Sequence, residues 1–557
     1  MFIKGNNLIE RFRNLEFASS FSVGEIGFGV GLNFLTTCKT WLEHTSPDKT
    51  LNFFSFDKYL FKYEDFKEII SLQSELTEQA QELIRFYPDN VEGVQRISLF
   101  QGRVLLNLVI GDIENTKDYL SLSHSIDAWY LDGFSPSKNP KLWSENLLKT
   151  IHKTCHIDST FSTYTSSGHV KTNLKIAGFK FFKVDGFSKK RHMLKGKVNT
   201  DLVKKNLIKG TIAVIGSGIA GCTLSQTLAR KGYNVDLFEK SESICSGASD
   251  HELLVTYPKL SAHDTAYGRF NLQAFLFSTR FYDQLQSTSW NKTGVLILDH
   301  NEETLKKHQS LLEKRSDGSI YKSLNEKEVS ELAGIELKHK GLLFKEAGYI
   351  SPKEICEELI DSPNINLITS AEVEDLRTVE NKTTFRIGSN IYEYEFLCLC
   401  AGSDTDSLID LEGFSKKRGQ VSHIESSEEF RKINLPICAK GYLSPRIGKL
   451  NVIGSSYSNL GDLEINYEEH LSNMEKLKVI TDKEAVVVSG RVGFRAVSKD
   501  HLPIVGEMNG IFFNTCHGSR ASVTAPISAE VIASLIGNEA SPLGARELKA
   551  LSPLRFN

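Results

Sequence analysis

Short apolar runs alternate with helical patterns along the first 195 or so residues. The apolar runs are FSVGEIGFG, LNFFSFD, LLNLVIGD, IDAWYLDG and STFSTYT, followed by KFFKV and RHMLKG. Continuous apolar strands separated by helices are typical of a parallel sheet with both faces covered. The pattern therefore predicts an α/β domain of Rossmann-like architecture with a mostly parallel sheet.

A polar stretch without a clear period, KVNTDLVKKNLIK, separates this region from a second strand-turn-helix pattern that begins at Thr211. Further along, near 260–340 and 418–488, the pattern becomes mixed and antiparallel. We expect a first domain over 1–197, a basic linker over 198–209 and a second domain over 210–557. The second domain is predicted to be a Rossmann-type nucleotide-binding lobe with an inserted mixed α+β substrate lobe.

Composition adds limits to this division. A chain of 557 residues exceeds what one hydrophobic core organises. No apolar run approaches the roughly 18 residues of a membrane span, and the N-terminus lacks a signal-peptide core, so a cytoplasmic protein is expected. The nine cysteines show no CxxC spacing and no Cys/His cluster, which predicts neither zinc nor a disulfide framework. Cys398 and Cys400 fit a buried strand.

The first glycine-rich turn, EIGFGVGLNFL, places Gly27, Gly29 and Gly31 between an apolar strand and a helix, with Glu25 ahead of them. Glycines let a ligand approach the backbone closely, and the helix N-terminus offers N–H groups. The spacing lacks the third glycine of a dinucleotide fingerprint and has no triphosphate motif. A ligand without a pyrophosphate, such as S-adenosylmethionine, fits better.

Acidic residues end the following strands. Asp57 is placed to accept hydrogen bonds from ribose hydroxyls, and Asp112 is in reach of an adenine amino group, although each residue alone could equally cap a helix. Asp132 ends a later strand in DAWYLDGFSPSKNP, where a carboxylate suits an aliphatic amine and can help remove its proton. Ligands of open α/β sheets bind at this edge. Alternatively, Asp132 is a turn former before Gly133.

The second turn, TIAVIGSGIAGCTLSQTLARKGYNVDLFEK, contains every part of the dinucleotide fingerprint. Gly216, Gly218 and Gly221 form GxGxxG, and Glu239 ends the next strand, where it would bind ribose. Glycine-bearing loops downstream favour FAD over NAD. The cofactor-binding residues predicted here are Gly216, Ser217, Gly218, Gly221, Glu239, Lys240, Gly247, Ala248, Ser249, Gly402, Gly518 and Ser519.

Two arginines near the C-terminus, Arg495 and Arg520, follow glycine-containing segments. In a flavin amine oxidase, an arginine can bind a substrate carboxylate through two parallel hydrogen bonds and orient the α-carbon toward the flavin. Taken alone, either residue is more often a surface or ion-pair arginine. The neighbours of Arg495 favour the functional interpretation.

Charge is distributed unevenly. The net charge is −3, yet 171–209 contains twelve Lys and Arg residues against two acids. Such a segment is either a solvated face with a polar linker or a strip that holds a phosphate backbone.

The motifs GFGVGLNFL, DAWYLDGFSPSKNP, GFSKKRHML, GQVSHI, GYLSP and SRASVTAPISAEVIA, in this order, resemble the family of bifunctional enzymes that modify the wobble uridine of tRNA. The resemblance covers nearly the whole chain. It implies an FAD-dependent oxidase of the glycine-oxidase type that removes the carboxymethyl group from 5-carboxymethylaminomethyl-2-thiouridine, with O2 as electron acceptor. The N-terminal domain would then methylate the exposed amine with S-adenosylmethionine to give 5-methylaminomethyl-2-thiouridine.

Carried over by motif, Asp132 is the methyltransferase carboxylate, the fingerprint residues hold FAD, and Arg495 and Arg520 face the oxidase substrate. The family carries several dozen residues before the segment matching FIKGNNLIERF, with which this sequence begins. Either the true start lies upstream or the methyltransferase lacks an element bordering its cofactor. Binding of tRNA would depend on the 171–209 strip, and neither a membrane nor a metal is expected as a partner.

Two other functions fit parts of the pattern. A free amino-acid or amine oxidase fused to a small-molecule methyltransferase would need no basic strip. An RNA-binding scaffold with vestigial cofactor folds would tolerate loss of Asp132 and Arg495, both of which are present.

Overall fold

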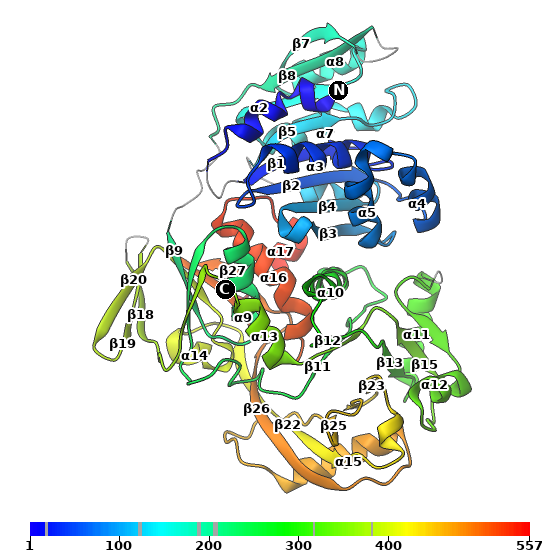
Figure 1. Ribbon diagram of the computed structural model, residues 1–557, viewed down its shortest axis with the longest axis vertical. Helices are drawn as coiled ribbons and strands as arrows, with labels where there is room; N and C mark the ends of the chain where they lie inside the picture. Colours follow the sequence, from blue (N-terminus) through cyan, green and yellow to red (C-terminus); the bar gives the residue numbers. More distant parts are fainter. Residues whose placement is uncertain (17–19, 121–124, 187–190, 204–209, 316–317, 380–381) are drawn as a thin grey trace. The chain divides into compact units, whose positions relative to one another are not determined.

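The computed structural model describes residues 1–16, 20–120, 125–186, 191–203, 210–315, 318–379 and 382–557. The chain forms two compact units, whose elements are labelled in Figure 1. Unit 1 comprises Met1–Lys209, Leu228–Tyr233 and Ala533–Lys549, and unit 2 comprises Gly210–Thr227, Asn234–Ile532 and Ala550–Asn557. Among the described residues, no helix is both long and apolar enough to cross a bilayer.

Unit 1 contains an eight-stranded sheet in the order β3-β4-β2-β1-β5-β6-β8-β7. The five strands from β4 to β6 in this order run parallel, whereas β3, β8 and β7 are each antiparallel to their neighbour. The predicted α/β fold with a mostly parallel sheet is confirmed. The strands are β1 (Ser20–Ile26), β2 (Thr50–Asp57), β3 (Gly93–Leu99), β4 (Val104–Ile110), β5 (Ile126–Leu131), β6 (Cys155–Thr163), β7 (Phe179–Asp185) and β8 (His192–Val198).

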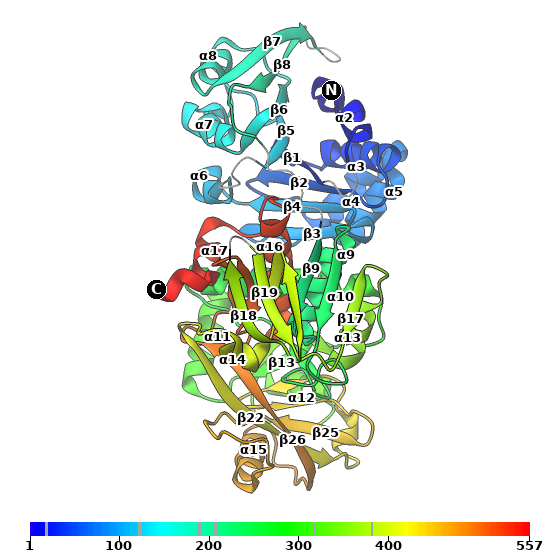
Figure 2. The same cartoon turned by 90° about the vertical axis from the view of Figure 1, so that its left-hand side faces the viewer.

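Helices cover both faces of this sheet, with α3, α4 and α5 on one face and α6, α7 and α8 on the other (Figure 2). Successive residues of a strand point to opposite faces, so Tyr130 joins the core on one face and its neighbour Trp129 joins the core on the other. Burial on both faces explains the continuous apolar strands. The helices are α1 (Phe2–Gly5), α2 (Leu8–Arg13), α3 (Leu32–His44), α4 (Tyr63–Ser71), α5 (Thr77–Arg85), α6 (Ile113–Thr116), α7 (Glu145–Lys153) and α8 (Gly168–Ile176).

Unit 2 begins with the second strand-turn-helix, β9 followed by α9 (Ile219–Arg230), as predicted. Its six-stranded sheet has the order β17-β10-β9-β21-β28-β27. Cys398 lies in β21 and Cys400 follows it, both buried, which confirms their predicted place in a buried strand. The strands are β9 (Thr211–Ile215), β10 (Asn234–Phe238), β17 (Ile365–Ile368), β21 (Phe396–Leu399), β27 (Ile504–Met508) and β28 (Ile511–Thr515), and α16 (Ala521–Ile536) follows β28.

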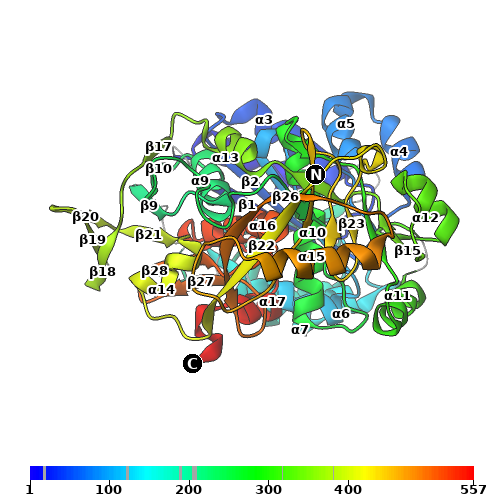
Figure 3. The same cartoon turned by 90° about the horizontal axis from the view of Figure 1, so that it is seen from below.

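A second large sheet, predominantly antiparallel, has the order β14-β15-β13-β23-β24-β25-β22-β26. Helix α15 (Tyr467–Ile480) lies across it, next to β22 and β25 (Figure 3). Apolar residues from the sheet and α15 share one core. The strands are β13 (Val295–Leu298), β14 (Lys322–Leu324), β15 (Gly341–Phe344), β22 (Phe414–Glu425), β23 (Ile437–Cys438), β24 (Tyr442–Leu443), β25 (Leu450–Gly454) and β26 (Val487–Ser498).

Smaller elements complete the chain. Two three-stranded sheets have the orders β11-β16-β12 and β18-β19-β20. Their strands are β11 (Leu254–Thr256), β12 (Trp290–Asn291), β16 (Gly348–Ile350), β18 (Glu374–Val379), β19 (Lys382–Ile387) and β20 (Asn390–Tyr394). The remaining helices are α10 (Ala266–Leu285), α11 (Glu302–Lys314), α12 (Glu326–Ala333), α13 (Pro352–Ile360), α14 (Thr405–Leu408) and α17 (Ala545–Leu551).

Two candidate functional sites

A pocket of about 530 Å³ lies in unit 1 at the carboxyl ends of β1, β2, β4 and β5. This is the edge at which open α/β sheets bind ligands. The predicted residues among its lining are Gly27, Gly29, Asp57, Asp112 and Asp132. The sequence thus brings the first glycine turn and three of the four predicted acids to one cavity.

The glycines of this turn adopt backbone conformations that other residues rarely tolerate. Gly27 has φ +97°, and a Cβ there would lie 3.0 Å from the carbonyl oxygen of Asp132. Gly29 has φ +55° with open space above it, so a ligand can approach its backbone. Gly31, with φ +71°, precedes the first residue of α3 and does not line the pocket.

Asp57 and Asp112 have protein partners as well as a place in the pocket. The Oδ2 atom of Asp57 accepts a hydrogen bond of 2.9 Å from the Gly29 N–H and so anchors the glycine turn. Asp112 caps α6 by accepting from the Glu114 N–H at 3.2 Å, and it pairs with Lys58 at 3.4 Å. Asp112 is therefore a helix cap, as one of the two predicted alternatives had it. Its carboxylate also borders the cavity.

Glu25, the fourth predicted acid, is fully buried behind the pocket and does not line it. The Oγ of Ser55 donates to one of its oxygens at 2.6 Å, and Nδ2 of Asn33 donates to the other at 2.9 Å. Burial raises the pKa of Glu25 to about 8, although these two hydrogen bonds oppose the shift. Glu25 therefore reaches the pocket through its hydrogen bond with Asn33 and through its charge interaction with Asp132 and Asp57.

Asn33 links Glu25 to Asp132, since its Nδ2 also donates to Oδ2 of Asp132 at 2.8 Å. Burial raises the pKa of Asp132 to about 6, and the hydrogen bond from Asn33 lowers it. A carboxylate with a pKa near 6 is ionised at neutral pH and can still accept a proton.

Sequence reasoning missed most of the other residues that line this pocket, among them Asn33 and Phe134. Asn33 lies in the first turn of α3, two positions after Gly31. This position directly after the glycine turn is the signal in the sequence that could have identified it as a pocket residue. The side chain of Phe134 is 71% exposed, and Nε1 of Trp143 fixes the backbone there by donating to the Phe134 carbonyl at 2.8 Å. The exposed glycine backbone and the carboxylates suit a nucleoside with a charged amino-acid tail.

A second pocket, of about 400 Å³, lies in unit 2 around the dinucleotide fingerprint. Ten of the twelve predicted cofactor-binding residues line it: Gly216, Ser217, Gly218, Glu239, Lys240, Gly247, Ala248, Ser249, Gly402 and Gly518. The other two, Gly221 and Ser519, do not.

The fingerprint glycines are required by close backbone contacts. A Cβ on Gly221 would lie 1.8 Å from the Gly216 carbonyl oxygen, so only glycine lets α9 pack this closely on the turn. Gly216 has φ +99°, and a Cβ there would lie 2.6 Å from the Cys400 carbonyl. The N-terminus of α9 therefore stands at the pocket, where its N–H groups favour a pyrophosphate.

Glu239 ends β10, and its buried carboxylate is held by serines. Both the N–H and the hydroxyl of Ser217 donate to its Oε2, at 3.1 and 2.6 Å. The Ser241 N–H and the Ser246 hydroxyl donate to Oε1, at 3.0 and 3.1 Å. Lys240 pairs with Asp404 at 2.7 Å. The carboxylate is thus fixed at the strand end where a ribose is bound in dinucleotide folds.

Arg495, on β26, is largely withdrawn from water and contacts neutral groups. Its Nη2 donates to the Ser455 hydroxyl at 2.7 Å, and Nη1 lies 3.3 Å from the Ser456 carbonyl. Burial lowers its pKa, and none of the described carboxylates forms an ion pair with it. Gly419 makes room for this side chain, since a Cβ there would lie 2.0 Å from the guanidinium. A desolvated guanidinium with only neutral partners is suited to binding a carboxylate.

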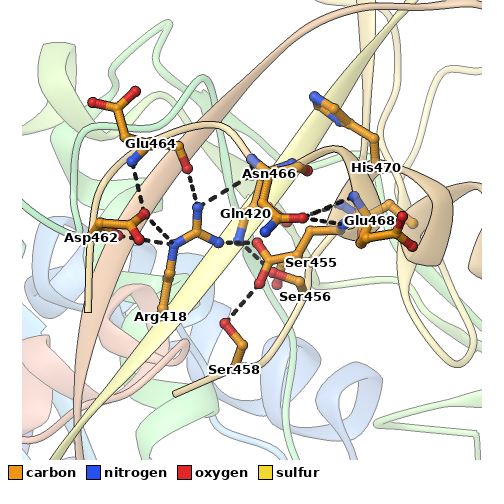
Figure 4. Close-up of polar contacts among 12 residues, drawn as sticks. Arg418, Gln420, Ser455, Ser456, Ser458, Asp462, Glu464, Asn466, Glu468 and His470 are labelled. Carbon is orange, nitrogen blue, oxygen red and sulfur yellow. Dashed lines mark hydrogen bonds and ion pairs between the residues drawn. The ribbon is translucent and has the colours of Figure 1, made fainter. Parts of the chain in front are cut away.

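A buried arginine holds the loop beside Arg495. Arg418 donates Nε to the Asp462 carbonyl at 3.0 Å (Figure 4). It also pairs with Glu469. Glu469 also accepts from the Ser458 hydroxyl at 2.7 Å. Burial alone would raise the pKa of Glu469. The pKa nevertheless lies below its ordinary value, because Ser458 and Ser456 donate hydrogen bonds to the carboxylate and Arg418 pairs with it. The loop 455–466 is therefore fixed to β22.

Arg520 has a different environment from Arg495. Its side chain stacks on Tyr257, with Cζ 4.1 Å from the ring centre, and Nη1 donates to the Tyr257 carbonyl at 2.8 Å. Its neighbours Gly518 and Ala521 line the pocket, but Arg520 does not. Arg520 and Arg495 thus contact different residues of unit 2.

The 171–209 strip is partly described. Lys189, Lys190, Lys204, Lys205 and Lys209 lie outside the described residues. The others are Lys171 and Lys175 on α8, Lys180 and Lys183 on β7, Arg191, and Lys195 and Lys197 on β8.

Three of these lysines share one face of the β7–β8 pair. Lys180 stands opposite Lys197, and Phe182 stands opposite Lys195. All four side chains are exposed, with Phe182 at 66%. Like charges placed directly opposite each other are unfavourable unless an anion lies between them. Three lysines around an exposed aromatic ring match a phosphate backbone with an adjacent base.

Over the described ranges of the chain, no group of three or more His, Cys, Asp or Glu side chains is arranged to hold a metal ion. All nine cysteines are buried, and none of them forms a disulfide.

Two family models match this chain. Residues 74–199 match the S-adenosyl-L-methionine-dependent methyltransferase model, and residues 211–535 match the FAD dependent oxidoreductase model. Among solved structures, glycine oxidase from Geobacillus kaustophilus superposes with a TM-score of 0.54 at 19% identity, covering 62% of this chain and 98% of that one. Glycine oxidase from Bacillus cereus gives a TM-score of 0.52 at 22% identity, covering 59% and 97%.

The folds and pockets thus define a two-part enzyme, a methyltransferase that uses S-adenosylmethionine joined to an FAD-dependent oxidoreductase. Proteins called tRNA 5-methylaminomethyl-2-thiouridine biosynthesis bifunctional protein MnmC align along the whole chain. The relative from Methylobacillus flagellatus is 32% identical over 100% of this chain and 91% of its own length, and that from Legionella pneumophila strain Corby is 32% identical over 100% and 92%. This chain belongs to the MnmC family.

Proposed function

We propose that this chain carries out two successive reactions on the wobble uridine of tRNA. Unit 2 removes the carboxymethyl group from 5-carboxymethylaminomethyl-2-thiouridine, and unit 1 then methylates the freed amine to give 5-methylaminomethyl-2-thiouridine. The observation that carries the proposal is the presence of two separate pockets in a single chain of this family. The carboxylate of Asp132 lines one pocket, and the other lies beside the guanidinium of Arg495, which has only neutral hydrogen-bond acceptors.

In the oxidation, Arg495 binds the carboxylate of the glycyl group through its two Nη atoms, which now contact only neutral oxygens. This contact fixes the methylene between the carboxylate and the nitrogen. The fingerprint turn and Glu239 would hold FAD, which would supply the two-electron oxidant for that methylene, with O2 as the final electron acceptor. The resulting substrate imine is hydrolysed to glyoxylate and the primary amine. Arg520, which stacks on Tyr257, is the second arginine that we expect to face this substrate.

In the methylation, the glycine turn with Asp57 and Asp112 holds S-adenosylmethionine, which supplies an electrophilic methyl group. Asp132 accepts a hydrogen bond from the substrate amine and takes up the proton that the nitrogen loses as the new C–N bond forms. Asn33 keeps the carboxylate of Asp132 oriented while Asp132 is ionised. Most of the acceleration comes from positioning the amine beside the methyl group.

The tRNA contacts the exposed face of β7 and β8. Lys180, Lys195 and Lys197 neutralise phosphates there, and the exposed Phe182 offers a surface for a base. We place the protein in the cytoplasm, where its RNA substrate is found.

Purified protein incubated with tRNA that carries the carboxymethylaminomethyl group tests the proposal, with and without S-adenosylmethionine. Nucleoside mass analysis should show the primary amine without S-adenosylmethionine and the methylated amine with it. Hydrogen peroxide from free glycine together with unchanged tRNA nucleosides would refute the proposal and favour a free amino-acid oxidase.

A further inference from the structure

The loop 455–466, between β25 and α15, exposes several large apolar side chains. They are Tyr457, Leu460, Leu463 and Ile465. Leu463 also lines the flavin pocket. Exposed apolar side chains at the edge of a cofactor site are suited to contact a substrate.

Tyr457 is the residue of this loop whose ring faces Arg495. The Cζ atom of Arg495 lies 6.0 Å from the centre of the Tyr457 ring, and the flanking residues Ser455 and Ser456 accept its hydrogen bonds. A separation of 6 Å is at the outer limit of a cation–π contact, so the arginine holds the ring weakly. The Tyr457 side chain is 58% exposed, which leaves much of the ring open to a ligand.

The backbone on either side of Tyr457 is fixed. The Ser456 N–H donates to the Gln420 carbonyl at 2.9 Å, and Ser458 exchanges two backbone hydrogen bonds with Arg418, of 3.0 and 3.1 Å. Arg418 itself is fully buried and paired with Glu469. An aromatic ring on such a backbone is oriented before a ligand arrives, which lowers the entropy cost of binding.

We propose that Tyr457 is the stacking site for the nucleobase of the oxidase substrate, an inference that rests on the proposed function. If Arg495 binds the carboxylate, four bonds of about 1.5 Å separate that carboxylate carbon from the pyrimidine ring. The pyrimidine therefore lies roughly 5 Å from the carboxylate, comparable to the 6.0 Å between Arg495 and the tyrosine ring. A planar base placed on Tyr457 completes a two-point contact, charge at one end and stacking at the other.

The rival interpretation is that Tyr457 only supports Arg495. These roles differ in their dependence on the substrate. Loss of support for Arg495 would weaken the binding of every substrate that has a carboxylate. Loss of a stacking surface would weaken the binding of only those substrates that have a base. N-methylglycine carries the carboxylate and the secondary amine without the base and serves as the probe.

The test compares Tyr457→Ala, Tyr457→Phe and the control Tyr467→Ala in full-length protein with bound FAD. Tyr467 is exposed at the end of the same loop and has no contact with Arg495 in the described structure. We expect Tyr457→Ala to lower kcat/KM for the modified tRNA about ten- to hundred-fold, the range for loss of one base–aromatic stack. The rate with N-methylglycine should stay within two-fold, and both Tyr457→Phe and Tyr467→Ala should behave like the wild type.

A binding measurement separates stacking from charge. The affinity of a modified anticodon stem-loop, followed by fluorescence anisotropy, should fall in Tyr457→Ala by a similar factor at every salt concentration, because a stacking contact releases no counterions. Equal losses with tRNA and N-methylglycine, or no loss with tRNA, would overturn the inference. Wild-type protein that oxidises N-methylglycine and leaves the tRNA unchanged would instead reject the proposed function.

Discussion

The Nδ2 atom of Asn33 lies 2.8 Å from Oδ2 of Asp132 and donates a hydrogen bond to it. The same nitrogen donates to Glu25. Two carboxyl groups with raised pKa values therefore share one amide donor, and only Asp132 borders the pocket. This arrangement supports the proposal that Asp132 takes up the proton, with Glu25 as a buried support.

Asp132→Asn keeps the shape of the side chain and removes its ability to take up a proton. We expect methylation of the primary amine to fall by about 10²- to 10⁴-fold, the usual contribution of a positioned base. Oxidation should continue, so 5-aminomethyl-2-thiouridine should accumulate in nucleoside mass analysis. Methyl incorporation at the wild-type rate would show that Asp132 is not the base.

The pH dependence of methylation follows from the environment of Asp132. Its pKa is raised to about 6, so the carboxylate is protonated below that pH and the rate should fall as pH drops through 6. Asn33→Ala removes a hydrogen bond to the ionised form, which raises this pKa further. The acidic limb of kcat/KM should then move to higher pH. If the acidic limb of kcat/KM lies at the same pH in the wild type and in Asn33→Ala, this account is contradicted.

Gly419→Ala tests the placement of Arg495 without altering the arginine. The new Cβ would fall 2.0 Å from the guanidinium and displace it. We expect oxidation of the modified tRNA to fall at least ten-fold while methylation of pre-formed amine is retained. Gly461→Ala, where a Cβ meets nothing within 4 Å, is the matched control. Equal activity in the two variants would mean that Arg495 does not need its present position.

Arg418 and Glu469 form a buried ion pair, and removal of one partner leaves an uncompensated charge. Arg418→Met should therefore lower the stability of unit 2 by about 3–5 kcal/mol. The double variant Arg418→Met/Glu469→Gln should recover most of that loss. The measurement is the urea midpoint of the transition that releases FAD. Additive losses in the double variant would show that the two residues are not coupled.

Lys180 and Lys197, directly opposite each other on β7 and β8, test the basic face. In Lys180→Ala/Lys197→Ala, the slope of log Kd for tRNA against log salt concentration should decrease by about 1.4–1.8, from two phosphate contacts. Stability should be unchanged or slightly higher, because a like-charge pair is removed. Lys306→Ala/Lys327→Ala, which removes two exposed helix lysines of unit 2, should leave the slope unchanged. An unchanged slope in the first variant would exclude this face.

The sequence predicts the parallel sheet of unit 1 well but misses its edge strand β3. That strand, GVQRISL, contains Gln95 and Arg96, both buried. Arg96 is accommodated because its Nε donates to the side chain of Asn107 on β4 at 2.8 Å. Polar residues that find partners on a neighbouring strand interrupt the apolar pattern, and this pairing cannot be recognised before the strands are known.

The candidate sites were predicted best where backbone geometry fixes the residue. Glycine turns and strand-end acids follow from local spacing, so Gly27, Asp132 and Gly216 lie at their expected pockets. The direction in which a side chain points is harder to predict from the sequence. Arg520 turns toward Tyr257, and Gly221 serves helix packing and does not line the pocket, because tertiary neighbours decide both.

Asp132 and Arg495 belong to different compact units, and each is recessed from the surface. If both proposed reactions take place on the wobble uridine, its base must leave the anticodon stack to reach either recessed side chain. Unstacking costs least for a base in a flexible single-stranded loop, so the flexibility of the anticodon loop becomes a property on which the rate of each proposed reaction depends.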